Sequence, residues 1–225
     1  MQKSTISLSF SPNQARLLFQ TLVIFGIFLV ALYAMDQIFL MFGKTHHIID
    51  LDGEANFPSW FSSVQLFFIG FLLFIQLFKT PQLKHISISF ISLIALSFIF
   101  LSLDETIQFH EKFPFGLIPI EWLPRFKDNY GAWIPIYVTM TFTFLIVFRK
   151  IIINLWQFYR KELIIFSIGM FFFLLGGVVL EIISIEHLFV NRLSKAYLLE
   201  VAMEEGLEMI GASFMLYASL LLALH

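Results

Sequence analysis

Residues 163–185 read LIIFSIGMFFFLLGGVVLEIISI, an apolar stretch with a single charged side chain, Glu181. A helix needs roughly twenty apolar residues to cross the hydrocarbon core of a bilayer, and this stretch has that length. Because lipid offers the backbone no hydrogen-bond partners, a spanning segment of this kind must be helical. The stretch therefore predicts a transmembrane helix.

Comparable apolar stretches, bounded by charged residues or Pro, recur along the chain. The expected spans cover residues 17–42, 58–78, 86–103, 131–148, 163–185 and 196–224. The first is too long for the apolar region of a secretory signal and has no clear cleavage site, so we expect it to be retained. We predict an all-α fold, one transmembrane domain (1–225) built as a bundle of about six helices.

The composition supports this fold class independently. Hydrophobic residues make up 59% of the chain and charged residues 13%, and the mean hydropathy is +0.85. A soluble domain of this length could not bury so much apolar surface. The chain has no Cys, which excludes disulfides, thiolate metal ligands and cysteine nucleophiles.

Basic residues favour the side of the membrane that carries both termini. That side is expected to hold Lys3, Arg16, Lys79, Lys84, Arg149, Lys150, Arg160 and Lys161, against Lys44, Lys112, Arg125, Lys127, Arg192 and Lys195 on the other. Since cytoplasmic loops carry the excess of bases, both termini are predicted to be cytoplasmic. The pairs at 149–150 and 160–161 are expected at helix ends around a short loop.

Acidic residues are distributed between the two sides of the membrane more unequally than basic residues. Fifteen of the sixteen lie at or toward the outer side, and only Glu162 belongs to the inner side. The longest loops and most of the Pro residues are also expected outside. Because binding and catalytic residues concentrate on such loops, the sequence predicts that function faces outward.

The first polar constellation, LDGEANFPSWFSS at residues 51–63, leads into the second span. Pro58 suits the first turn of a helix, and Glu54 or Asn56 can cap its free N–H groups. A well-formed interfacial helix start explains these residues. The functional interpretation uses three polar side chains on successive helix faces, which could orient a bound group: Ser62, Ser63 and Gln65.

The second constellation, SLDETIQFHE at residues 102–111, ends the third span. On a straight helix Asp104 and Glu111 share one stripe, Glu105 lies on another, and His110 points about 100° away from Glu111. A straight helix therefore cannot direct Asp104, His110 and Glu111 at one point. A shared site needs a helix break or ligands from other spans, and the alternative is a helix end emerging into water.

The third constellation consists of carboxylates inside the last two spans: Glu181, Glu200, Glu204, Glu205 and Glu208. Each intramembrane carboxylate costs about 2.5 to 3.5 kcal/mol on insertion scales, so the group must be protonated, paired or bound to cations. The structural alternative is a network of protonated Glu that holds the helices together.

Small residues suggest how these two spans meet. Gly176 and Gly177 lie near Glu181, and Ala202 and Gly206 lie four residues apart on the last span. Small surfaces of this kind let membrane helices approach closely. We expect the approach to bring Glu181 toward Glu205 or Glu208.

An oxygen-rich ligand set with one imidazole suits Mg, Ca, Mn, Zn or a di-iron centre, so the cofactor considered is a divalent metal of open identity. The Glu-x-x-His pattern of di-iron bundles is absent. A bis-His haem site is not expected either, since His85 and His110 fall on opposite sides of the membrane.

The first functional hypothesis is an outward-facing membrane enzyme that acts on a lipid-like substrate. Its expected metal ligands are Glu181, Glu205, Glu208, His110 and Glu111. Its expected catalytic residues are Asp104, His110, Glu208 and Ser62. Further polar residues assigned to the site are Glu54, Asn56, Ser63, Glu105 and Glu204.

Two non-enzymatic alternatives stay open. One is an accessory subunit that docks a membrane protein partner through its outer loops. The other is a proton or cation pathway, since carboxylate chains in membranes relay protons. The expected surroundings are the lipid bilayer, and no nucleic-acid partner is expected.

Taken together, the blocks LDGE-x-N-x-P-x-WFSS, SLDE-x4-HE and EE-x-x-EM-x-G resemble the signatures of an uncharacterised family of small bacterial polytopic membrane proteins. This resemblance spans most of the chain and implies that the blocks belong to one site in the bacterial cytoplasmic (inner) membrane, but it brings no established activity. There is also a loose similarity to the alkaline ceramidase superfamily, whose zinc site uses three His with Asp and Ser. Here six spans are expected instead of seven, with one His near the outer site.

Overall fold

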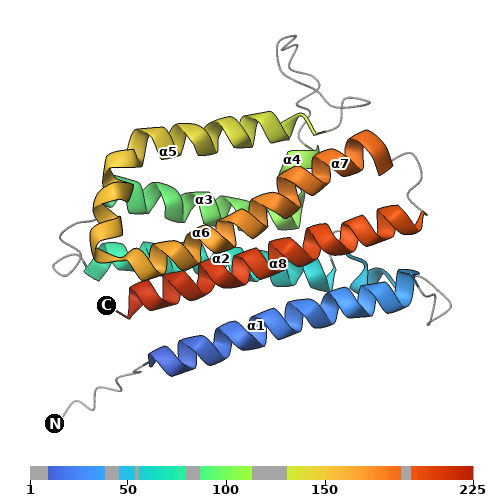
Figure 1. Cartoon of the computed structure of the whole chain (residues 1–225), viewed down its shortest axis with the longest axis horizontal. Coiled ribbons are helices and arrows are strands. Elements are labelled where there is room, and N and C mark those ends of the chain that lie inside the picture. Colours follow the sequence, from blue (N-terminus) through green and yellow to red (C-terminus); the bar gives the residue numbers. More distant parts are fainter. Residues whose placement is uncertain are drawn as a thin grey trace.

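The computed structural model describes residues 10–38, 46–53, 56–79, 87–112, 131–188 and 194–224. In these ranges the regular structure is entirely helical, as predicted. Six helices are long and apolar enough to cross a membrane, and they cover Pro12–Gln37, Phe57–Gln76, Ile88–Ile107, Trp133–Phe158, Arg160–His187 and Lys195–Ala223 (Figure 1).

The spans contain short π-helical pieces as well as α-helix. The elements are α1 (Pro12–Tyr33), η1 (Ala34–Ile38), η2 (His47–Ile49), α2 (Phe57–Gln76), η3 (Leu77–Lys79), α3 (Ile88–Ile107), α4 (Phe109–Lys112), α5 (Trp133–Phe158), α6 (Arg160–Leu174), η6 (Leu175–Leu180), α7 (Glu181–Ile183), η7 (Ser184–Leu188) and α8 (Lys195–Ala223). The π-helices are η1, η6 and η7.

The spans lie side by side, with the start of α1 and the C-terminus at the same end of the bundle (Figure 1). We call this the base-rich end, because Arg16, Arg149, Lys150, Arg160 and Lys161 lie on the elements there. The opposite, acid-rich end contains η1, the start of α2, the end of α3, η7 and the start of α8.

Helix α8 is the central helix of the bundle. It packs against α1, α2 and α6, whereas α2 packs chiefly against α3. One apolar core joins α2, α3 and α8 and contains Leu66, Ile69, Leu73, Ile91, Ala95, Phe98, Ala212, Met215 and Leu216. A second joins α1, α2 and α8 nearer the acid-rich end and contains Leu29, Tyr33, Leu51, Phe61, Tyr197, Val201, Ala202 and Met209.

Local sequence signals fix two of the helix starts. Ser11 caps α1, and Asn56 caps α2 by accepting a hydrogen bond from the Ser59 backbone N–H at 3.0 Å. Pro58 occupies the first turn of α2, where its missing N–H costs nothing. The predicted capping role of Asn56 and the placement of Pro58 are confirmed, whereas Glu54 lies outside the described residues.

The predicted end of the fourth span is wrong. We expected a helix over residues 131–148 with Arg149 and Lys150 at its end, but α5 continues to Phe158 and a single residue, Tyr159, separates it from α6. Residues 149–158, RKIIINLWQF, contain no Gly or Pro that would stop a helix. Figure 1 shows the C-terminal part of α5 turning across the base-rich end instead of continuing along the bundle.

Two helices also begin earlier in the chain than the apolar runs predicted. The first helix starts at Pro12 instead of residue 17, and the fifth span starts at Arg160 instead of residue 163. Both starts are polar helical turns, which a search for apolar residues leaves out. The expected continuation of the first span to Phe42 lies outside the described residues.

The predicted close approach of the last two spans is confirmed at Gly176. A Cβ atom there would lie 2.6 Å from the backbone oxygen of Glu204, and one at Gly169 would lie 2.6 Å from the backbone oxygen of Gly211. The expectation for Gly206 is wrong, because that residue packs against Val30 of α1. Helix α8 therefore has glycines on two faces: Gly211 lies against α6, and Gly206 lies against α1.

Candidate functional site

Helix α3 ends in a break that brings its last carboxylate to a histidine. Gln108 adopts the left-handed conformation, with φ 56° and ψ 46°, and its N–H donates to the Asp104 carbonyl at 2.8 Å. This conformation ends the helix and turns the short α4 back toward Asp104. The break that a shared site requires is therefore present.

The side chain of Asp104, which is 4% exposed, accepts three contacts. The His110 backbone N–H donates to Oδ1 at 2.8 Å, the Tyr137 hydroxyl donates to Oδ2 at 2.9 Å, and His110 Nδ1 lies 3.1 Å from Oδ2. We call Asp104, His110 and Tyr137 the Asp104 unit. The side chain of Glu111, the third residue expected here, lies outside the described set.

Aromatic rings surround the Asp104 unit. The ring of Trp133 lies edge-on to His110 at 4.9 Å and to Tyr137 at 5.2 Å, and Phe100 contacts both Phe109 and Tyr137. The unit therefore links the start of α5 to the end of α3 through one buried carboxylate. Tyr137 and Trp133 were missed because nothing in the sequence places α5 beside α3.

A second Asp–His pair closes the end of α1. Asp36 lies in the π-helix η1 with its side chain fully buried, and it accepts from the His46 backbone N–H at 2.9 Å while His46 Nδ1 lies 3.0 Å away. Sequence reasoning missed this pair. The available signal was a carboxylate at the end of an apolar span, followed by two histidines in the next loop.

Five glutamates at the acid-rich end lie near one another, and we call them the glutamate group. Glu204 of α8 faces Glu181, Glu208, Glu205 and Glu200, with Glu181 the strongest of these electrostatic neighbours. Glu181 of α7 thus lies within electrostatic reach of Glu204 of α8, and its expected approach to Glu205 or Glu208 stays a prediction.

The glycines of η6 make room for the glutamate group. A Cβ atom at Gly177 would lie 2.7 Å from Oε1 of Glu208, so the Glu208 carboxylate lies directly over this glycine. Gly176 admits the α8 backbone at Glu204 in the same way. Because π-helical segments are frequent at functional sites, the presence of η1, η6 and η7 at this end agrees with a specialised site there.

Within the glutamate group, the carboxylate of Glu200 is buried, and its hydrogen-bonding neighbours are the side chains of Glu204 and Ser184. Beside the group, the hydroxyl of Tyr33 is buried without a hydrogen-bond partner in the described part of the chain. Tyr33 is 0% exposed and faces Glu200, Glu205, Asp50 and Asp52. The sequence did not single out Tyr33.

The loop before α2 adds two aspartates. The Tyr197 hydroxyl donates to Asp52 Oδ1 at 2.6 Å, which ties this loop to the start of α8. Burial raises the pKa of Asp50 above its ordinary value, and the neighbouring Asp52 charge adds to the increase. Asn56 holds the loop by donating from Nδ2 to the carbonyls of Asp50 and Gly53.

The polar residues of α2 have separate partners. Ser63 donates to the Ser102 carbonyl at 2.8 Å, and Gln65 Nε2 donates to Ser213 Oγ of α8 at 2.7 Å. The Ser62 hydroxyl and Gln65 Oε1 are buried without a partner among the described residues. Ser62 lies one turn before Gln65 on α2, on the helix face that meets α8.

The structure does not unite the predicted metal ligands. His110 contacts Asp104, whereas Glu181, Glu205 and Glu208 face Glu204, and no three described His, Asp or Glu side chains are arranged to hold a metal ion. Glu105 lies half-buried near the end of α3. The contacts described here group these residues into the Asp104 unit and the glutamate group, and a single site that joins the two stays a prediction.

Comparison with known proteins supports the family resemblance seen in the sequence blocks. No curated protein and no solved structure matches the chain. A family model described as a domain of unknown function (DUF8692) matches residues 17–224. The match includes all six candidate spans in whole or in large part, and the chain therefore belongs to the DUF8692 family.

Proposed function

We propose that the protein is a multi-pass membrane protein that binds a cation at its acid-rich end, between α1, α8 and η6. The observation that carries this proposal is the Glu200 carboxylate, which is 7% exposed and whose polar neighbours Glu204 and Ser184 bring it no positive charge. An ionised carboxylate buried in this way costs several kcal/mol unless it is paired. A bound cation would offset that cost.

The surroundings of Glu200 strengthen the case. Among the described residues, the charged groups with the largest electrostatic effect on Glu204 are carboxylates: Glu181, Glu208, Glu205 and Glu200. The Tyr33 hydroxyl, buried near Glu200 and Glu205, has no hydrogen-bond partner in the described part of the chain, so its oxygen is available to a ligand there. A buried carboxylate and an unpartnered hydroxyl in one negative environment together favour a positively charged ligand.

Two chemical sources of positive charge fit this site, a metal ion and an organic ammonium group. The carboxylates are not preformed as a set of three metal ligands among the described residues. A metal would therefore draw them closer together, whereas an ammonium group could be held by charge at longer range. The assay below separates the two.

The test is cation-dependent thermal stabilisation of the purified protein in detergent. Mg²⁺, Ca²⁺, Mn²⁺, Zn²⁺, ethanolamine and choline are compared at constant ionic strength. Stabilisation by one class, saturating at one ligand per chain, identifies the source. If every salt acts alike, the proposal is wrong.

Glu200→Gln is the decisive variant, because its two expected effects have opposite signs. Glutamine removes the uncompensated charge, so the unliganded protein should become more stable, while the stabilisation by the cation should disappear. A misfolded variant would lose both the stability of the unliganded protein and its stabilisation by the cation. Glu162→Gln at the base-rich end is the matched control and should leave both values unchanged. An unchanged cation response in Glu200→Gln would contradict the proposal.

We also propose that the acid-rich end faces away from the cytoplasm. The support is the concentration of basic residues on the elements at the opposite end, in keeping with the excess of bases in cytoplasmic loops. A bacterial inner membrane stays a prediction from the family resemblance.

A second candidate function, acid–base catalysis on a lipid-like substrate, rests on the Asp104 unit. A carboxylate bonded to Nδ1 of a histidine fixes the orientation of the ring, as in hydrolase triads. Lipid analysis of membranes containing either wild type or His110→Gln tests this candidate. A lipid that accumulates only with the variant supports it, and identical profiles contradict it.

A further inference from the structure

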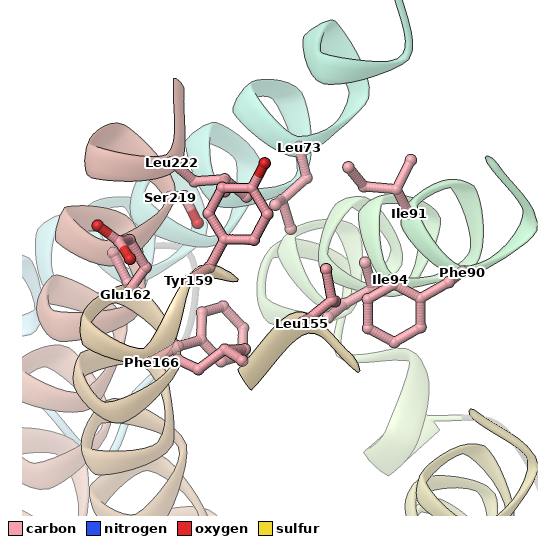
Figure 2. Close-up of a pocket in the computed structure, with 12 residues that line it drawn as sticks. Leu73, Phe90, Ile91, Ile94, Leu155, Tyr159, Glu162, Phe166, Ser219 and Leu222 are labelled. Carbon is pink, nitrogen blue, oxygen red and sulfur yellow. The ribbon is translucent and has the colours of Figure 1, made fainter. Parts of the chain in front are cut away.

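An apolar pocket lies near the base-rich end of the bundle, lined by residues from five helices (Figure 2). Its walls come from α2, α3, α5, α6 and α8 and include Leu73, Ile91, Leu155, Phe166 and Ala218. Leu73, Ile91, Leu155 and Ala218 are each between 2% and 5% exposed. The pocket is small, with a volume of about 70 Å³, and its inner side lies against buried residues of the bundle while its mouth is open.

The pocket is covered by the part of α5 that crosses the end of the bundle. Leu155 from this segment and the following Tyr159 both line the pocket, and Figure 2 shows them on the same side of it as Phe166. In the same segment Arg149, Lys150, Asn154 and Gln157 are exposed, while Ile151 and Ile152 are half-buried. Such a helix, apolar on one face and basic on the other, is typical of segments that lie in the membrane interface.

Polar groups are confined to one side of the pocket. Figure 2 shows the Tyr159 hydroxyl, the Ser219 hydroxyl and the Glu162 carboxylate near the otherwise apolar walls. Arg160 and Lys161 lie between Tyr159 and Glu162 in the sequence, and both are exposed. Arg160 also lies over the Trp156 ring, 5.6 Å from its centroid. With Arg149 and Lys150, four bases stand against one acid, a local net charge of +3.

We propose that this pocket holds part of one acyl chain of an anionic phospholipid, whose headgroup phosphate pairs with Arg160 and Lys161. The apolar walls favour a hydrocarbon chain, since burying apolar surface is favourable and a charged ligand would lose its hydration there. The positive charge at the mouth favours an anionic headgroup, and each basic residue near such a surface contributes about 1 kcal/mol, or about fivefold in affinity.

Native mass spectrometry of the detergent-purified protein tests this proposal with two lipids of identical acyl chains, phosphatidylglycerol and phosphatidylcholine. We expect one phosphatidylglycerol molecule per chain to bind at least about fivefold more tightly than phosphatidylcholine. The double variant Arg160→Gln/Lys161→Gln should lose that preference, because both residues are exposed and only their charge changes. Lys195→Gln at the acid-rich end is the charge control and should keep the preference for phosphatidylglycerol.

The acyl-chain part is tested by filling the pocket. Ala218→Leu adds bulk at a buried wall position, and Ile94→Phe does so at a half-buried one, which gives a second variant if the first does not fold. Either folded variant should bind both lipids more weakly. Leu145→Phe, on the exposed face of α5, is the matched control. Equal binding of the two lipids by wild type would overturn the headgroup assignment, and undiminished binding by a folded filled variant would overturn the pocket assignment.

Discussion

His110 Nδ1 lies 3.1 Å from Oδ2 of Asp104, six residues earlier in the chain, because the left-handed Gln108 turns α4 back over the end of α3. The same carboxylate accepts a hydrogen bond from Tyr137, so it holds α3, α4 and α5 together. Most of α5 is exposed or half-buried, and its buried residues are Ile134 and Leu155. Asp104 attaches the start of α5 to α3, and the Phe90 ring of α3, which contacts Phe144 and Phe148, attaches its middle.

This relationship predicts unequal costs for two substitutions. Tyr137→Phe removes one hydrogen bond and should lower stability by about 1 kcal/mol. Asp104→Ala leaves the Tyr137 hydroxyl and the His110 N–H groups without an acceptor in a buried place and should cost about 3 kcal/mol. Thermal unfolding in detergent measures both, with Thr143→Val on the exposed side of α5 as the control. Equal costs for the two variants would show that the contacts of His110 with Asp104 contribute nothing to stability.

The two glycines of η6 should respond differently to alanine. At Gly176 the added methyl group would meet the Glu204 backbone oxygen at 2.6 Å, and a backbone atom between packed helices cannot move aside. Overpacking of this kind costs about 1 to 3 kcal/mol. At Gly177 the obstacle is the Glu208 carboxylate, the far end of a flexible side chain, which can rotate away.

Gly176→Ala should therefore lower the unfolding temperature clearly, whereas Gly177→Ala should be folded with little loss. The latter should also weaken the cation response, because Glu208 is displaced. The two variants are each other's control, since each adds one methyl group to the same helix. A larger loss of stability in Gly177→Ala than in Gly176→Ala would contradict the packing described here.

Asp50 should make stability depend on pH. Burial first, and the Asp52 charge second, raise the pKa of Asp50 above its ordinary value, so the folded protein favours the protonated carboxyl. The resulting stabilisation is complete below the ordinary value of 3.8 and is lost as the pH rises through the raised pKa. Asp50→Asn, which stays neutral, should lose less stability than wild type as the pH is raised from 4.

The measurement for Asp50 is the difference in unfolding temperature between wild type and Asp50→Asn at each pH in detergent. Glu162→Gln, which also removes one acid, corrects for the change in net charge. If the difference between wild type and Asp50→Asn does not vary with pH, the burial of Asp50 does not control its ionisation.

The all-helical fold class was predictable from two facts. The thirty Phe residues indicate a protein surface that lies in lipid, and in lipid a spanning segment must form the hydrogen bonds of its own backbone as a helix. The spacing of Glu204, Glu205 and Glu208 also predicted that at least three acids share one face of the last span. The Asp36–His46 pair and the Tyr137 contact were not predictable, since each depends on the path of the chain between elements. The sequence did not predict the extension of α5 past Arg149. The charges of Arg149 and Lys150 suggest the end of a span, but no Gly or Pro follows them to stop the helix.

The orientation of the bundle gives the last prediction. The chain contains no Cys, so single-cysteine variants need no background substitution. His47 is exposed at the acid-rich end and Lys161 is exposed at the base-rich end. If the bases mark the cytoplasmic side, His47→Cys in intact cells should react with a thiol reagent that cannot cross the membrane, and Lys161→Cys should react only after permeabilisation. The opposite pattern would show that the acid-rich end faces the cytoplasm, and labelling of both variants in intact cells would contradict a membrane between them.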